Sequence, residues 1–209
     1  MFENREIAGK LLAQEIKKRY PNISRQEYIV VALPRGGVPI AKEIAKTLDL
    51  DMDIFFVKKI PSPFNKEAAI GAVSENGYFF VDERIKNLLN IDEVYIKNNI
   101  KEILEKIASK RALYNKAKSS FKDKNVILVD DGVATGSSMI LAIDALKKEG
   151  AKKVIVAAPV APLEVATRLK EIADDAIFLL TPTNFNAVGQ YYIDFHQLDD
   201  NEVIELLNN

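Results

Sequence analysis

The sequence predicts an α/β fold, a doubly wound and mostly parallel sheet with helices on both faces. Short runs of apolar, largely β-branched residues alternate along the chain with stretches of helical periodicity. The runs are continuously apolar instead of alternating with polar residues, which is typical of strands covered on both faces. A chain of 209 residues is long enough to bury such a core.

The strands and helices are predicted in alternating order, as right-handed crossover connections require. The predicted strands are 28–33, 52–57, 126–129, 154–158 and 176–180. The predicted helices are 3–20, 38–48, 92–118, 137–149 and 162–173. The first helix stops before Pro21, because proline disfavours helical backbone in the residue before it. Residues 60–78 contain two prolines and two glycines and form either a small hairpin or a mobile loop.

The composition excludes several classes of site. The chain has 29 Lys+Arg and 30 Asp+Glu, so its net charge of −1 gives no general reason to bind nucleic acid or an anionic membrane. It has no cysteine, which excludes disulfides, thiolate nucleophiles and thiolate zinc sites. A single histidine, His196, leaves little room for a Ser/His/Asp triad. No apolar run approaches 18 residues and the first ten residues are polar, so we expect a cytoplasmic protein.

Four of the nine glycines lie in two segments, LPRGGVP (33–39) and DDGVATGSS (130–138). Each segment directly follows a predicted strand and precedes a predicted helix. In an open parallel sheet, this position is the crevice at the carboxyl ends of the strands, where ligands bind.

The second segment has the chemistry of a phosphate site joined to a polyol site. Backbone N–H groups at a helix N-terminus, with the hydroxyls of 135–138, can bind phosphate without a cationic side chain. Asp130 and Asp131 would repel a bare phosphate but accept hydrogen bonds from vicinal hydroxyls, with or without a divalent cation. Gly132 and Gly136 are separated by three residues and no lysine follows, so this is not a Walker A loop.

The segment VILVDDGVATGSS resembles the signature loop of the type I phosphoribosyltransferases, which bind 5-phosphoribosyl 1-pyrophosphate (PRPP). The resemblance continues through ALPRGGVPIA, FFVKKI, AAIGAVSENG and TPTNFNAVGQYY and covers nearly the whole chain. The chain is similar to a branch of this family whose acceptor is undefined.

The resemblance implies roles for both loops. Asp130 and Asp131 would bind the ribose hydroxyls directly or through Mg²⁺, the cofactor expected, and 134–138 would hold the 5-phosphate. Arg35 would contact the leaving pyrophosphate, and with Asp130 and Asp131 it forms the implied catalytic set. The implied substrate-binding residues are Arg35, Gly36, Gly37, Lys58, Lys59, Asp130, Asp131, Gly132, Val133, Ala134, Thr135, Gly136, Ser137 and Ser138.

Lys58 and Lys59 are predicted to close the second strand at the same edge of the sheet. Because successive residues on a strand face opposite ways, at most one of them points into the crevice. The segment 60–78 falls where the family has a loop that closes over the reacting centre. Glu67 lies in it, and we assign Glu67 no role.

The resemblance also implies one domain, 1–209, with a core of about 26–181 and a small hood made by the chain ends, about 1–25 and 182–209. The tail contains four aromatic residues, which we expect to pack it onto the core in preference to stacking a base: Phe185, Tyr191, Tyr192 and Phe195. We expect His196 to be a structural hydrogen-bonding residue.

Residues 106–124 contain seven Lys+Arg and one acid, Asp123. Such a run could contact RNA, but a solvated helix face is the interpretation we favour.

The predicted function is displacement of pyrophosphate from the anomeric carbon of PRPP by a small nitrogenous base, in a homodimer without membrane or nucleic-acid partners. The alternative is a non-catalytic regulatory protein that binds PRPP or a nucleotide. The LPRGG segment and the two lysines favour the enzyme, since a sensor of ribose phosphate needs less leaving-group machinery.

Overall fold

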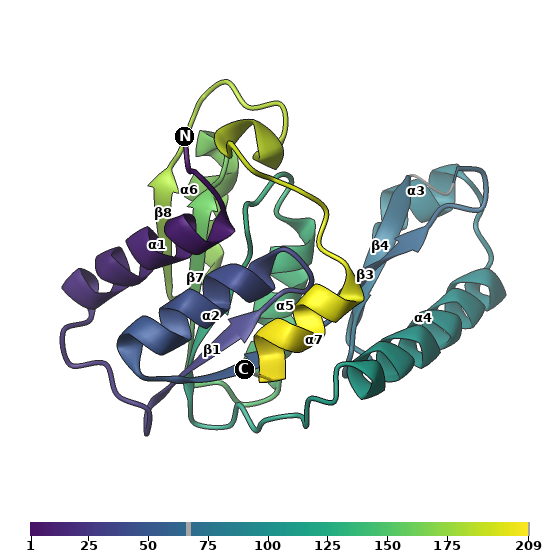
Figure 1. Ribbon diagram of the computed structural model, residues 1–209. Helices are drawn as coiled ribbons and strands as arrows, with labels where there is room; N and C mark the ends of the chain where they lie inside the picture. The colour runs from purple at the N-terminus through teal and green to yellow at the C-terminus, as the bar shows by residue number, and fades with distance from the viewer. Residues whose placement is uncertain (66–67, 209) are drawn as a thin grey trace.

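The computed structural model describes residues 1–65 and 68–208. Its main body is a five-stranded sheet in the order β2-β1-β6-β7-β8, in which every neighbouring pair is parallel (Figure 1). The strands are β1 (Tyr28–Ala32), β2 (Asp51–Ile54), β6 (Asn125–Val129), β7 (Lys153–Val160) and β8 (Asp175–Leu180). The predicted α/β fold with a parallel sheet is therefore confirmed.

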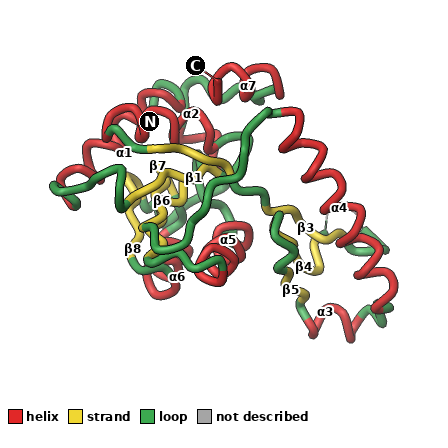
Figure 2. The backbone as a smooth tube through the Cα atoms, turned by 90° about the horizontal axis from the view of Figure 1, so that it is seen from below, coloured by secondary structure: helices red, strands yellow, loops and turns green. Residues whose placement is uncertain are grey.

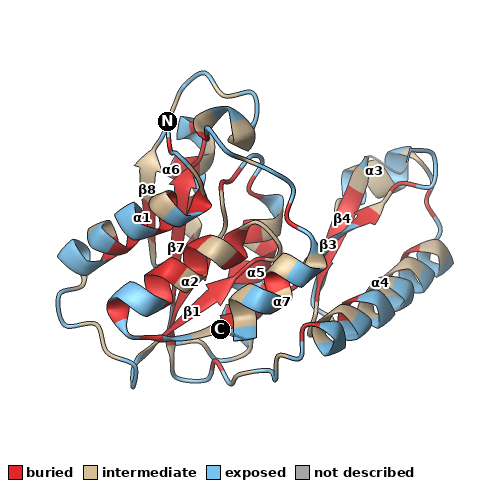
Figure 3. Cartoon of the chain, in the orientation of Figure 1, coloured by how far each residue is buried: buried red, intermediate tan, exposed pale blue. Residues whose placement is uncertain are grey.

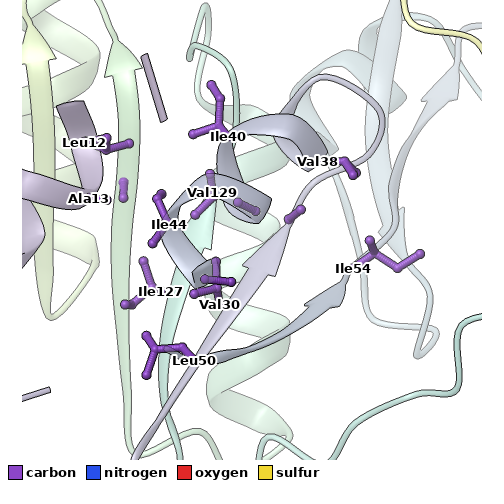
Figure 4. Close-up of a cluster of buried hydrophobic side chains, with 14 of the residues drawn as sticks. Leu12, Ala13, Val30, Val38, Ile40, Ile44, Leu50, Ile54, Ile127 and Val129 are labelled. Carbon is purple, nitrogen blue, oxygen red and sulfur yellow. The ribbon is translucent and has the colours of Figure 1, made fainter. Parts of the chain in front are cut away.

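Helices cover both faces of this sheet. One face carries α1 (Arg5–Arg19), α2 (Gly37–Leu48) and α7 (Asp200–Asn208), and the other carries α5 (Ser137–Lys148) and α6 (Leu163–Ile172) (Figure 2). Alternate residues of each strand enter the two cores: Val30 and Ile127 face α1 and α2 (Figure 4), while Ile29 and Leu128 face α5 and α6. Both faces are buried, which explains the continuously apolar runs (Figure 3).

A second, smaller unit projects from the main body, and we call it the flap. It consists of the antiparallel strands β3 (Val57–Pro61), β4 (Ala69–Ser74) and β5 (Phe79–Val81) with the helices α3 (Glu83–Leu88) and α4 (Glu93–Leu113) (Figures 1 and 2). It has its own core, which includes Ile60, Ile70, Val73, Ile91 and Ile96. For its described residues, the segment 60–78 is a hairpin, the first of the two alternatives that the sequence left open.

The prediction of one strand over 52–57 is wrong. β2 ends at Ile54, and the chain then enters β3 of the flap sheet at Val57. The run is apolar throughout because Phe55 and Phe56 between the strands are also buried, one in each core. Lys58 and Lys59 therefore lie within an antiparallel flap strand and do not close a strand of the main sheet, contrary to the prediction.

The predicted helix boundaries agree with the observed ones to within two residues, except at the end of the long helix, and two short helices were not predicted. The long helix ends at Leu113, five residues before the predicted 118, and the chain turns at Asn115, which has a φ of 49°. The short helices α3 and α7 had no prediction. Among the residues that the structure describes, no helix combines the length and apolar character needed to cross a membrane.

The N-terminal residues lie beside the segment 191–194 of the C-terminal tail. The backbone N–H of Phe2 donates to the carbonyl of Tyr191 (2.7 Å), and that of Ile193 donates to the carbonyl of Phe2 (2.8 Å). Beyond this contact, α1 packs an apolar side that includes Leu12 and Ile16 onto the main core, and α7 inserts Val203. Both terminal segments are thus anchored by helices on the sheet.

A buried ion network joins the flap to the main sheet. Arg111 on α4 pairs with Asp53 on β2 (Nη1–Oδ1, 3.2 Å) and with Glu75 directly after β4 (Nη2–Oε1, 3.0 Å). Asp53 is fully buried, and the side chains of Glu75 and Arg111 are 4% and 15% exposed. Arg111 also donates to the carbonyl of Ile54. The prediction of a solvated face for 106–124 is therefore wrong at Arg111.

We expect Arg111→Met to lower the free energy of unfolding by about 3–5 kcal/mol, because it removes the cation paired with buried Asp53 and leaves buried Glu75 with Lys118 at 3.8 Å. Urea unfolding measures this change. Lys101→Met on the exposed side of the same helix is the control, with an expected change within about 0.5 kcal/mol. Equal losses in the two variants would contradict a joining role for Arg111.

Candidate functional site

The candidate site lies where the strand order of the main sheet reverses. From β1 the chain continues to β2 on one side, and from β6 it continues to β7 and β8 on the other. The loops after β1 and β6 therefore diverge and leave a crevice at the carboxyl ends of these strands. These two loops are the glycine-bearing segments that the sequence analysis singled out.

The two loops are in direct contact because glycines allow it. A Cβ on Gly36 would lie 2.2 Å from Asp131 Oδ2, and a Cβ on Gly37 would lie 2.6 Å from the carbonyl oxygen of Val129. Gly36 has an ordinary helical φ of −58°, so close approach, and not backbone conformation, requires glycine there. The Pro34–Arg35 peptide bond in this loop is cis.

Asp130 and Asp131 form a pair of half-buried carboxylates at the end of β6. Burial and the neighbouring charge of Asp131 raise the pKa of Asp130 well above its usual value. Burial also raises the pKa of Asp131, although the positive charge of Arg5 opposes that shift. Asp130 Oδ1 accepts a hydrogen bond from the backbone N–H of Asp131 (2.9 Å). The pair is thus held in a site that favours positive or hydrogen-bond-donating ligands.

Arg5, at the start of α1, joins this pair to the tail of the chain. Its Nε donates to Asp131 Oδ2 (2.8 Å), and its Nη1 donates to the carbonyl of His196 (2.9 Å). Its guanidinium carbon lies 3.9 Å from the centroid of the Phe195 ring. Sequence reasoning missed Arg5, since the separation of 126 positions between it and Asp131 carries no signal of the contact.

The loop after β6 divides into a packed part and an exposed part. A Cβ on Gly132 would lie 2.4 Å from Val188, and Val133 is buried and donates its N–H to the carbonyl of Val160. Ala134, Thr135 and Ser137 are exposed at the start of α5, where Gly136 has a φ of 78°. Thr135 Oγ1 lies 3.3 Å from Ser137 Oγ. The exposed part therefore offers hydroxyls and a helix N-terminus to a ligand.

Three cations lie around Asp200 of α7. Lys110 Nζ lies 2.5 Å from Asp200 Oδ2, and Arg35 Nη1 lies 4.0 Å from Asp200 Oδ1. The Tyr114 hydroxyl donates to the same carboxylate (2.9 Å). Burial, followed by the positive charges of Lys110 and Arg35, lowers the pKa of Lys58. We call Arg35, Lys58 and Lys110 the basic cluster; the solvated-face prediction is wrong at Lys110 as well.

Two cavities adjoin these groups. A small one of about 290 Å³ lies between Arg5, Arg35, Asp131 and residues 195–198, which we call the strap. A larger cleft of about 1130 Å³ lies between β3 and α4, and both Lys58 and Lys59 line it.

The aromatic residues of the tail pack against the N-terminal segment and against one another. Tyr192 is buried against Phe2 and donates its hydroxyl to the carbonyl of Asp131 (2.6 Å). Phe195 stacks on Tyr192 at 5.0 Å, and Phe185 stacks on Tyr191 at 5.6 Å. The tail thereby fixes the backbone of the carboxylate loop.

His196 is exposed and lies between two acids, Asp194 (Nδ1–Oδ1, 3.2 Å) and Glu202 (Nε2–Oε1, 2.8 Å). Hydrogen bonds to Glu202 and Asp194 raise the pKa of His196. The hydrogen bond between the His196 ring and Glu202 connects the strap to α7.

The comparisons with known proteins agree with this geometry. The model of the phosphoribosyl transferase domain family matches residues 2–196. A Mycobacterium tuberculosis protein whose name places it among the phosphoribosyl transferases is 32% identical over 210 residues, which cover all of this chain and 46% of the relative. The chain thus spans about half the length of that relative.

The crystal structure of a Thermus thermophilus protein is similar along its whole length, with 36% identity and a TM-score of 0.82. The alignment covers 99% of this chain and 97% of that one. An amidophosphoribosyltransferase of Haemophilus influenzae is 39% identical over 157 residues, which cover 75% of this chain and 25% of the relative.

The raised pKa of Asp130 predicts a stability cost at neutral pH. An aspartate of the unfolded chain titrates near pH 4. Because folding raises the pKa of Asp130, stability falls as the pH rises from about 4 through that raised pKa, and then levels off. We expect Asp130→Asn without Mg²⁺ to unfold at a higher temperature than the native protein at pH 7.5, by about 2–4 °C per kcal/mol gained.

Thermal unfolding at several pH values measures this gain, which should disappear toward pH 4. Asp144→Asn, at an exposed position of α5, is the control and should show no such pH-dependent gain. A lower unfolding temperature for Asp130→Asn at pH 7.5 would contradict the prediction.

Proposed function

Because the chain belongs to the phosphoribosyl transferase family, we propose that it binds PRPP in the crevice between the β1 and β6 loops and transfers the phosphoribosyl group to a nitrogenous acceptor. In this reaction the bond from the anomeric carbon to the pyrophosphate oxygen breaks. A bond from the same carbon to the acceptor nitrogen forms, and the acceptor gives up a proton.

The observation that carries this proposal is the contact of Gly36 with Asp131. Around this contact lie Asp131 and Arg35, which line one cavity, and the exposed helix N-terminus with hydroxyls that follows the carboxylate pair; Lys110 is linked to Arg35 through Asp200. A ribose with vicinal hydroxyls suits the carboxylates, a monophosphate suits the helix N-terminus, and a pyrophosphate suits the cations. PRPP carries these three groups on one molecule.

The residues would divide the work as follows. Asp130 and Asp131 would accept hydrogen bonds from the ribose hydroxyls and fix the ring. Backbone amides and hydroxyls of 134–138 would hold the 5-phosphate. Arg35 would donate to pyrophosphate oxygens, where negative charge increases as the bond breaks, so its attraction is greatest in the transition state.

Mg²⁺ fits the donor set of this site. Magnesium is usually held by one or two carboxylates together with substrate phosphates, and Asp130 and Asp131 are adjacent carboxylates of this kind. When bound, the ion would supply positive charge that offsets the charge of the pyrophosphate.

The test is calorimetric titration of Mg·PRPP into the native protein and into Asp130→Asn/Asp131→Asn. Loss of two charged acceptors should weaken binding by about 100-fold or more, since a hydrogen bond to a charged group contributes about 1.5–3 kcal/mol. Circular dichroism verifies the fold, and Asp144→Asn is the matched control. Equal affinity of the native protein and the double variant would refute the assigned site.

Catalysis is tested separately, by release of pyrophosphate when purine and pyrimidine bases are offered with Mg·PRPP. Release that depends on a particular base identifies the acceptor. Tight PRPP binding with no release for any base would favour the non-catalytic alternative.

A further inference from the structure

The basic cluster draws its three cations from three separate elements. Arg35 comes from the loop after β1, Lys58 from β3 and Lys110 from α4. The flap therefore contributes two of the three, and its attachment through Arg111, the residue after Lys110, fixes their position against the main body. Such an arrangement brings positive charge from the flap to the mouth of the crevice.

The positive charge of the cluster exceeds the negative charge beside it. Among the described residues, Asp200 is the carboxylate that pairs with Arg35 and Lys110. The pKa of Asp200 is lowered by its hydrogen bonds to Lys110 and Tyr114 and by the charge of Arg35, so it is a firmly ionised counter-ion. Lys58 and Lys110 line the same cleft, and the pKa of Lys58 is lowered first by burial and then by the charges of Lys110 and Arg35. A dianionic group would relieve this imbalance more fully than one carboxylate does.

Asp200 is not the residue that caps its own helix. The N-terminus of α7 is capped by its neighbours: the backbone N–H of Glu202 donates to Asp199 Oδ1 (2.9 Å), and that of Asp199 donates to Glu202 Oε2 (2.8 Å). Val203 anchors the helix in the main core. The side chain of Asp200 is instead directed to Lys110 and Tyr114 on α4 and directly after it.

We propose that Lys110 binds the pyrophosphate of the substrate together with Arg35 and Lys58, and that Asp200 is an internal counter-ion that the pyrophosphate displaces. This assignment rests on the proposed function and adds two residues to it. Displacement of Asp200 would also release the ion pair that links α7 to α4. Occupancy of the pyrophosphate position would then be coupled to the contact between the C-terminal helix and the flap.

The test compares Lys110→Gln and Asp200→Asn in calorimetric titrations with inorganic pyrophosphate, Mg·PRPP and ribose 5-phosphate. Lys110→Gln should weaken pyrophosphate and Mg·PRPP binding by about tenfold or more, because it removes a charged hydrogen bond. Its affinity for ribose 5-phosphate should not change, since that ligand has no pyrophosphate. Asp200→Asn keeps an acceptor for Tyr114 and removes the competing charge, so it should tighten pyrophosphate binding by about two- to fivefold.

The double variant isolates the counter-ion role. In the Lys110→Gln background, Asp200→Asn should tighten pyrophosphate binding less than it does alone, because the two residues act on each other. Lys101→Gln, at an exposed position of α4 outside the cleft that Lys58 and Lys110 line, is the control and should bind like the native protein.

Native-like pyrophosphate affinity in Lys110→Gln, or weaker binding in Asp200→Asn, would overturn the assignment. The proposed function fails differently: the native protein would then not bind Mg·PRPP, or Asp130→Asn/Asp131→Asn would bind it unchanged.

Discussion

The site depends on the close approach of the loops after β1 and β6. Parallel pairing of these strands places both loops at one edge of the sheet, but pairing alone would leave room for two separate loops. The missing side chain of Gly36 lets the Asp131 carboxylate lie against the backbone of the first loop. Other contacts of the site build on this one: Arg5 and Tyr192 hold Asp131, and Arg35, which precedes Gly36, pairs with Asp200.

The local sequence predicted that the two loops share one edge of the sheet, although not that Gly36 touches Asp131, and the reason is topological. Both glycine segments follow continuously apolar runs, and such runs are buried strands whose carboxyl ends share an edge. Order along the chain was therefore enough to place Arg35 near Asp130. It was not enough at 52–57, where apolar residues continue through the passage between two sheets. Buried residues between two sheets have the same sequence pattern as a strand. The sequence therefore could not show that Lys58 belongs to a strand of the flap sheet.

The remaining partners could not be predicted because they come from helices distant in sequence. Helical periodicity shows which side of a helix is polar, but it does not show what that side faces. Lys110 and Arg111 are consecutive residues in one basic run. One is a half-buried partner of Asp200, and the other is enclosed between Asp53 and Glu75. Both were expected in solvent, and the acids that hold them lie outside the run.

In the proposed complex, the charges around the crevice would favour one ligand and one orientation. Asp130 and Asp131 precede the exposed amides and hydroxyls of 134–138, and Arg35 lines the same small cavity as Asp131. A ligand bound in reverse would place its pyrophosphate at the segment 134–138, which has no cationic side chain, and leave the cations with only Asp200. A ligand with a phosphate at the carboxylates would meet like charge. Discrimination between ligands would thus come from repulsion of phosphate by the carboxylates as much as from attraction of phosphate by the amides, hydroxyls and cations. Burial and the charge of Asp131 raise the pKa of Asp130, so ionising this half-buried pair is unfavourable, and the same like charge would disfavour a phosphate bound beside it.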